Sequence, residues 1–151
     1  MTTQPLDIIK YQGDEKSSIL RQVAIPVEDP SDTYIKTLVD QIVETAKTIN
    51  GLAIAAPQVG HSVRLFVMQT NHGLTAYANP VILKKVGTIR IVEGCLSIPG
   101  IQVKKVRAKQ IKMRAYDVLL GQEVTIKYRD LEAACVQHEI DHLDGVLIID
   151  S

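Results

Sequence analysis

The 151-residue chain contains no tryptophan, a single phenylalanine and only two cysteines, and its formal net charge is zero. With few aromatic side chains to stack on bases and no excess of positive charge, we expect no nucleic-acid partner. Two cysteines cannot build the disulfide framework of a small secreted protein, so we expect a reducing, cytoplasmic location. The sequence also lacks a signal-peptide pattern and any apolar stretch of the roughly 20 residues that span a bilayer, so we expect no membrane partner.

The composition is that of one globular domain over residues 1–151, with 46% hydrophobic and 23% charged residues. Apolar residues spaced three and four apart predict a helix in the first third of the chain. These residues are Ile35, Leu38, Val39, Ile42, Val43, Ala46 and Ile49. Ser31 or Asp32 is a suitable cap for its start, and Asn50-Gly51 a stop signal for its end.

The middle of the chain has the pattern of short strands, expected at residues 63–69, 75–83, 86–92, 101–106, 111–116 and 123–128. Pro80 indicates a sheet edge or a bend, and residues 118–121 a hairpin turn. The lysine pairs at 84–85 and 104–105 are expected at solvated strand edges. A final helix is predicted from about residue 130 to 143, ended by Asp144-Gly145. This order predicts an α+β fold, with antiparallel sheets packed around the C-terminal helix and a further N-terminal helix.

The predicted final helix carries the sequence His138-Glu139-Ile140-Asp141-His142. Residues four apart lie on one helix face, so both imidazoles can bind one metal ion. Glu139 is rotated about a quarter turn from His138, which places it beside the ion, where a general base acting on water should lie. The motif is short, and two surface histidines on a charged helix are the alternative. A catalytic ion needs a third protein ligand, expected upstream because only nine residues follow His142.

The upstream candidates for the third ligand are Cys95, Cys135, His61 and His72. Cys135 shares the helix face but lies about 10 Å along the axis from His142, so we expect it to be a core residue. Both histidines lie in polar, turn-like stretches and are expected to be exposed. Cys95 follows an apolar strand and Gly94, where the backbone can turn sharply. Cys95 is therefore the predicted third ligand of a Cys-His-His set, although a lone cysteine there is usually a buried core thiol.

Three segments, in this order, resemble the peptide deformylase family. Residues 51–58, Gly-Leu-Ala-Ile-Ala-Ala-Pro-Gln, are similar to the family's G-x-G-x-A-A-x-Q segment. Residues 93–97, Glu-Gly-Cys-Leu-Ser, match E-G-C-x-S, and residues 137–142, Gln-His-Glu-Ile-Asp-His, match Q-H-E-x-D-H. The similarity extends over essentially the whole chain.

The resemblance implies a metal-dependent hydrolase that removes the N-formyl group from the N-terminal methionine of newly made polypeptides and releases formate. It implies Fe²⁺ as the native ion, with Zn²⁺, Ni²⁺ or Co²⁺ able to substitute, a choice that the spacing of the ligands does not make. It also implies that Glu139 carries protons, and that the Gln58 amide and the Leu96 backbone N–H donate to the oxyanion. The implied substrate-binding positions are Gly51, Leu52, Ala53, Gly94, Leu131 and Ala134.

The sequence departs from the family pattern at two places. Ala53 replaces a glycine, and we expect its methyl group to be tolerated if φ is negative. Many family members continue past the metal-binding helix, whereas this sequence stops at Ser151, so the resemblance does not extend to a ribosome contact made through such an extension. Two other functions remain open. The missing downstream ligand disfavours another kind of metallopeptidase, and only Ala53 favours a protein that binds peptides without turnover.

Overall fold

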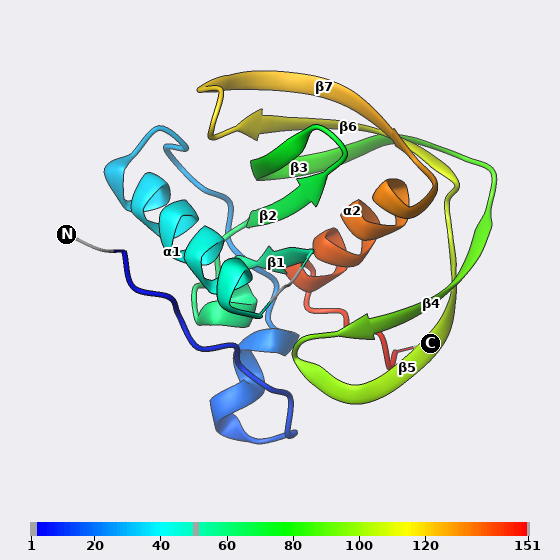
Figure 1. Cartoon of the computed structure of the whole chain (residues 1–151), viewed down its shortest axis with the longest axis horizontal. Helices are drawn as coiled ribbons and strands as arrows, with labels where there is room; N and C mark the ends of the chain where they lie inside the picture. The colour runs from blue at the N-terminus through cyan, green and yellow to red at the C-terminus, as the bar shows by residue number, and fades with distance from the viewer. Residues whose placement is uncertain (1–2, 50–51, 151) are drawn as a thin grey trace.

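A computed structural model describes residues 3–49 and 52–150. Within these ranges the elements are η1 (Glu15–Arg21), α1 (Thr33–Ile49), β1 (Ala53–Ala55), η2 (Ala56–Val59), β2 (Leu65–Thr70), β3 (Gly73–Val86), β4 (Ile89–Cys95), β5 (Ile98–Arg107), β6 (Gln110–Asp117), β7 (Gln122–Arg129) and α2 (Asp130–Leu143). The strands form an antiparallel five-stranded sheet of order β1-β2-β3-β6-β7 and an antiparallel β4-β5 ribbon. Figure 1 shows α2 between the curved sheet and this ribbon, which confirms the predicted α+β fold.

The metal-motif helix α2 begins and ends where the sequence predicts, at Asp130 and Leu143. Its apolar side packs against the inner face of the large sheet, where Phe66, Tyr77 and Met113 are fully buried. The helix stops before Gly145, whose φ of +74° suits glycine. A Cβ there would lie 2.5 Å from the Arg21 carbonyl oxygen, so the chain passes too close for any other residue.

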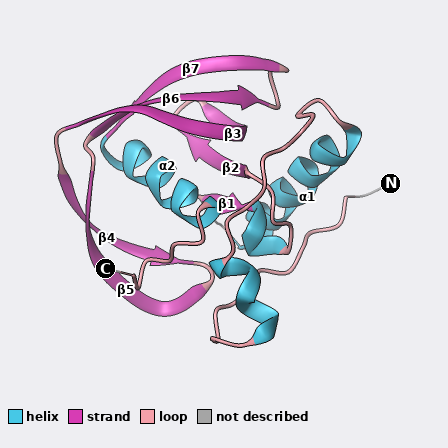
Figure 2. Ribbon diagram, turned by 180° about the vertical axis from the view of Figure 1, so that it is seen from behind, coloured by secondary structure: helices cyan, strands magenta, loops and turns pink. Residues whose placement is uncertain are grey.

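The N-terminal helix α1 covers the other end of the sheet (Figures 1 and 2). Most of its predicted apolar stripe is buried or packed on the core, and the Asp32 side chain accepts a hydrogen bond of 2.9 Å from the Tyr34 N–H, as a helix cap does. The predicted stop at Asn50-Gly51 lies outside the described residues. Among the described residues, no helix combines the length and the apolar character that crossing a membrane requires.

The strand bounds differ from the prediction by up to three residues. β4 runs from Ile89 to Cys95 instead of residues 86–92, β5 begins at Ile98 instead of residue 101, and β3 continues to Val86 instead of ending at residue 83. The break that separates it from β4 is Gly87, whose φ is +68°. Pro80 lies at a register shift between Ala78 and Val81, just beyond the last pair with β2, so it occupies both a bend and the start of an edge, as predicted. The short elements η1, β1 and η2 were not predicted.

Candidate metal centre

The structure brings the three predicted metal ligands together. Cys95 ends β4, while His138 and His142 lie one turn apart on α2. Their ligand atoms all lie within 4.8 Å of one another, with 3.3 Å between Cys95 Sγ and His142 Nε2. One thiolate and two imidazoles leave room for a further ligand on a catalytic ion, which is the arrangement that such a centre needs.

The three rejected candidates lie outside this group. Cys135 is half-buried on α2 and packs against the core, and desolvation raises the pKa of its thiol, which disfavours the thiolate that a metal ligand must be. His72 is exposed, as predicted. His61 was expected to be exposed but is half-buried. The Tyr34 ring packs beside it, and the Tyr34 hydroxyl lies 2.8 Å from its Nδ1.

His138 is oriented by a carboxylate to which the sequence analysis gave no role. Glu93 Oε1 accepts a hydrogen bond of 3.0 Å at Nδ1 of His138. This contact places the proton on Nδ1 and leaves Nε2 free to bind a metal, as carboxylates beside ligating histidines commonly do. Glu93 precedes Cys95 by two residues, so one end of β4 supplies both a ligand and the residue that orients another ligand.

Arg107, at the end of β5, links Glu93 on β4 to the helix α2. Its guanidinium makes two hydrogen bonds of 2.8 Å to Glu93 and one of 2.6 Å to Asp141, which lies between the two histidines on the helix. Burial alone would raise the pKa of Glu93, but the bonds to Arg107 and His138 lower it to about 2. Glu93 is therefore a permanent carboxylate. Arg107 was missed because no local pattern links it to the motif, and Asp141 lies within the motif but was given no role.

Glu139 is 3% exposed, and its Oε2 lies 3.8 Å from Nε2 of His138. Its Oε1 has no hydrogen-bond partner within residues 3–49 and 52–150, and neither does Nδ1 of His142. Buried polar atoms without partners are costly, so unpaired groups beside a ligand set fit a site built to receive an ion and a polar substrate. Burial also raises the pKa of Glu139 to about 7, close to that of an effective general base at neutral pH.

Gln58 in η2 lies beside Cys95 and lines the same cavity as Glu139. Its Oε1 accepts a hydrogen bond of 2.9 Å from the Ala55 N–H, which fixes the orientation of the amide. Its Nε2 donates to Ser97 Oγ at 3.2 Å and lies 3.8 Å from Cys95 Sγ. Gln58 is 2% exposed, so its amide is enclosed by the protein. The amide presents an N–H donor beside the metal ligands.

A cavity of about 490 Å³ opens beside the ligand set. Its walls include all the described residues that the resemblance assigned to substrate binding, namely Leu52, Ala53, Gly94, Leu131 and Ala134, together with Leu96, Ile91 and Cys135. Gly51, the remaining position, lies outside the described residues. Leu52 and Leu131 are 73% and 69% exposed, so two large apolar side chains stand at the entrance. Such a surface suits an apolar substrate group.

Ala53 begins β1, pairs with Met68 and has a negative φ, so its backbone is ordinary strand. A methyl group there is therefore compatible with the fold. We expect Ala53→Gly to change kcat/KM for a formyl-methionyl peptide by less than about tenfold, or roughly 1.4 kcal/mol. The measurement is formate release by both forms loaded with the same metal. A hundredfold gain in the variant would contradict this view of Ala53.

The sequence matches the polypeptide deformylase family over residues 5–151. The chain belongs to this family. It is 44% identical to the peptide deformylase of Dictyoglomus turgidum over 119 residues, which cover 79% of this chain and 77% of that one. It is 41% identical to the peptide deformylase of Acetivibrio thermocellus, with 94% and 81% covered.

Solved deformylase structures share the fold. The crystal structure of the Thermotoga maritima peptide deformylase has a TM-score of 0.89 and 39% identity, with 97% of both chains covered. The Synechococcus elongatus enzyme in complex with actinonin has a TM-score of 0.88 and 34% identity, with 99% of this chain and 80% of that one covered. As a peptide deformylase, the chain is a metal-dependent hydrolase that removes the N-formyl group from methionine at the N-terminus of polypeptides.

Proposed function

We propose that residues 1–151 form a single catalytic domain in which Cys95, His138 and His142 hold Fe²⁺ for the deformylation of newly made polypeptides. The observation that carries this proposal is the convergence of three ligand atoms within 4.8 Å beside the buried, unpaired carboxylate of Glu139. A Cys-His-His set suits both iron and zinc, and the family resemblance favours iron. Zn²⁺, Ni²⁺ and Co²⁺ are expected to substitute.

Glu139 is the proposed proton carrier. A bound divalent ion supplies Lewis acidity, which lowers the pKa of water and polarises the formyl carbonyl. Glu139 takes the proton of the attacking water and later gives it to the leaving amine. Its burial supports both steps, because a carboxyl whose pKa is near 7 can hold and release a proton at neutral pH.

Gln58 and Leu96 are the proposed donors to the carbonyl oxygen as it becomes negatively charged. The Ala55 N–H holds Gln58 Oε1, so the Nε2 donors face the cavity side of Cys95 before substrate arrives. Leu96 follows Cys95 directly and lines the same cavity, where its backbone N–H is the second donor. Donors fixed in advance stabilise an oxyanion without reorganisation.

The methionine side chain is proposed to bind among Leu52, Leu131 and Ala134, with the backbone at Ala53 and Gly94 beside the peptide. This assignment is supported by the apolar wall that these residues form around the cavity. It is also supported by a relative from Acinetobacter baumannii, 28% identical with a TM-score of 0.87, whose structure is described as bound to Met-Ala-Ser. A cytoplasmic location is supported by the free thiols of Cys95 and Cys135.

The test is formate release from formyl-Met-Ala-Ser by the protein loaded anaerobically with Fe²⁺ or with Co²⁺. We expect turnover with both ions and none with acetyl-Met-Ala-Ser, because the larger acyl group must fit against the same fixed donors. If no formate is released with Fe²⁺ and none with Co²⁺, the result would support the alternative in which peptides bind without turnover.

Cys95→Ser tests the ligand assignment. A serine hydroxyl is a much poorer ligand than a thiolate for Fe²⁺ or Zn²⁺, so we expect metal affinity to fall at least about tenfold, with activity falling in parallel. The measurement is the metal content per chain after dialysis against a series of increasing chelator concentrations. Cys135→Ser is the matched control, and it should retain the wild-type metal content. Full metal content in Cys95→Ser would show that Cys95 is not a ligand.

A further inference from the structure

The charges of this neutral chain are segregated along its sequence. Residues 81–129 contain 11 of the 17 Lys and Arg residues but only three of the 17 Asp and Glu residues. The rest of the chain is correspondingly acidic. Asymmetry of this kind indicates an interaction with a charged partner, and net charge alone does not reveal it. The expectation of no nucleic-acid partner rested on that net charge and on the scarcity of aromatic side chains.

The fold gathers part of this positive charge on one surface. Lys84 on β3 lies directly opposite Lys112 on β6, which lies directly opposite Lys127 on β7. Alternate residues of a strand point to opposite faces, and the neighbours of Lys112 on β6 are buried toward α2, so the three lysines share the outer face of the sheet. Arg114 and Arg129 occupy alternate positions on the same face. We call these five residues the basic face.

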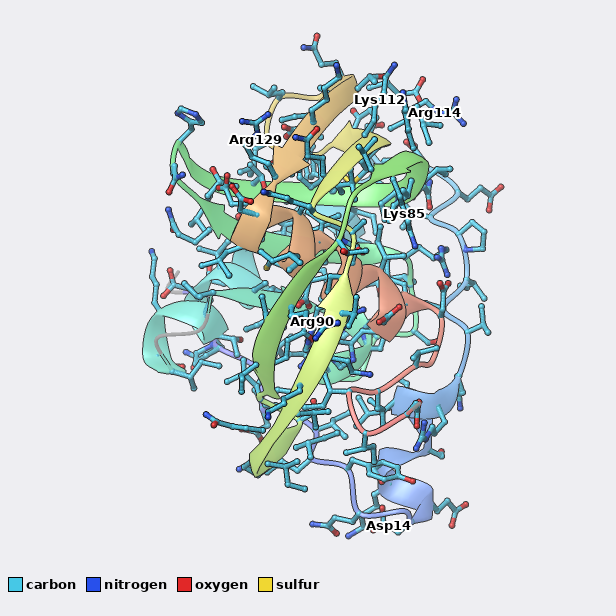
Figure 3. The ribbon with its side chains drawn as sticks, turned by 90° about the vertical axis from the view of Figure 1, so that its right-hand side faces the viewer. Asp14, Lys85, Arg90, Lys112, Arg114 and Arg129 are labelled. Carbon is cyan, nitrogen blue, oxygen red and sulfur yellow. The ribbon has the colours of Figure 1, made fainter. Side chains whose placement is uncertain are left out.

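Figure 3 shows Lys112 and Arg114 beside each other at one end of the molecule, with Arg129 at the same end but to one side of them. Arg90 on β4 lies apart from them, near the middle of the same view. None of the five side chains of the basic face forms an ion pair or a hydrogen bond with any other residue that the structure describes. Some cations elsewhere do bind carboxylates, among them Arg64 and Arg107.

This arrangement costs stability within the chain. Like charges directly opposite each other on neighbouring strands repel, and Lys112 has a lysine on both sides. On the outward positions of β7, Glu123 is the only acidic residue, and it lies opposite Tyr116 instead of a cation. Within the described part of the chain nothing offsets the repulsion, whereas an anionic partner would.

The surface is larger than a single small anion requires. Four of its cations, Lys84, Lys112, Lys127 and Arg129, line a shallow hollow of about 340 Å³. Positions on adjacent strands are about 4.8 Å apart, and alternate positions along a strand are about 6.8 Å apart. The basic face is thus an array of closely spaced positive charges on a rigid sheet, which fits a polymer with closely spaced negative charges.

We propose that the basic face binds the phosphate backbone of a folded RNA. A nucleic-acid backbone carries phosphates at a linear density that the scattered carboxylates of a protein surface do not reach. Tyr116 is the only aromatic residue at the outward positions of β6, so the face offers no platform for stacking bases. Binding is therefore to the backbone and independent of base sequence. The face lies across the sheet from α2, so a bound RNA leaves the metal site open.

The test is fluorescence anisotropy of the metal-loaded protein with a labelled RNA hairpin of about 20 base pairs, at several salt concentrations. We expect a Kd of about 10⁻⁶–10⁻⁴ M at physiological salt. The affinity should fall steeply as the salt concentration rises. The variant K84Q/K112Q/K127Q should bind at least about tenfold more weakly, with a slope of log K against log salt reduced by about 2–3. The single variant Lys112→Gln should reduce that slope by about 1.

The matched control is K16Q/K36Q/K47Q, which removes three exposed lysines from the acidic part of the chain and changes net charge equally. It should retain most of the RNA affinity. Formate release and Tm of K84Q/K112Q/K127Q should equal or exceed those of the wild type, because the substitutions relieve repulsion away from the metal site. The proposal is overturned if the control loses as much affinity as the variant, or if RNA does not bind. It is also overturned if polyglutamate or phosphatidylglycerol vesicles bind more tightly than RNA.

Discussion

Replacing Glu139 with glutamine is expected to lower kcat/KM for formyl-Met-Ala-Ser by about 10²–10⁴-fold, the usual contribution of a positioned general acid–base group. Glutamine has nearly the same size, so it can occupy the same buried position beside His138, but it cannot take a proton from water. The metal ligands are untouched. The measurement combines formate release with metal content per chain, so that the rate is expressed per bound ion.

The control for this variant is Glu132→Gln. Glu132 lies in the first turn of the same helix, where its carboxylate accepts a hydrogen bond of 2.9 Å from the Asn71 N–H. An amide oxygen can accept the same bond, so the control should keep both the fold and the rate. If Glu139→Gln bound a full complement of metal and turned over at the wild-type rate, the proton carrier would have to be another group.

The helix that carries the motif could be predicted from sequence because its information is local. The spacing of His138 and His142 and the Asp144-Gly145 stop describe a helix whose ends agree with the structure. Rejection of Cys135 was equally local, because the rise of a helix fixes how far its residues lie apart. The choice of Cys95 needed elimination, since nothing in its own segment says that β4 ends against α2.

The surroundings of the ligands could not be predicted in the same way. Gln58 follows a proline in a short turn, and its amide acquires direction only from the Ala55 N–H and from Ser97, 39 residues away. The Arg107 contacts join residues 14 and 34 positions apart in sequence. Pairings of this kind follow from tertiary structure alone, and the spacing of apolar residues along the sequence does not predict them. The basic face was not predicted for the same reason, because β3 and β6 pair although the whole β4-β5 ribbon separates them in sequence.

Arg107→Met is expected to destabilise the metal-free protein by about 3–5 kcal/mol, because it leaves a buried carboxylate without its counter-charge. The side chains of Arg107 and Glu93 are 10% and 7% exposed, so solvent cannot replace the lost interaction. Methionine preserves much of the apolar volume of the arginine stem, so loss of packing contributes little. The measurement is urea unfolding in the presence of a chelator, with wild type and variant compared at the same pH.

The same variant should also bind metal about 10–100-fold more weakly, because Arg107 holds the Glu93 carboxylate that orients His138. The double variant E93Q/R107M separates the two effects. With neither charge buried alone, we expect it to recover most of the stability, whereas a neutral amide at position 93 makes His138 a less basic ligand than a carboxylate does. Recovery of stability without recovery of metal affinity would show that the Glu93-Arg107 pair acts on the metal site by positioning the ligand. Recovery of both together would instead show that the ion pair influences the metal site only through the stability of the fold.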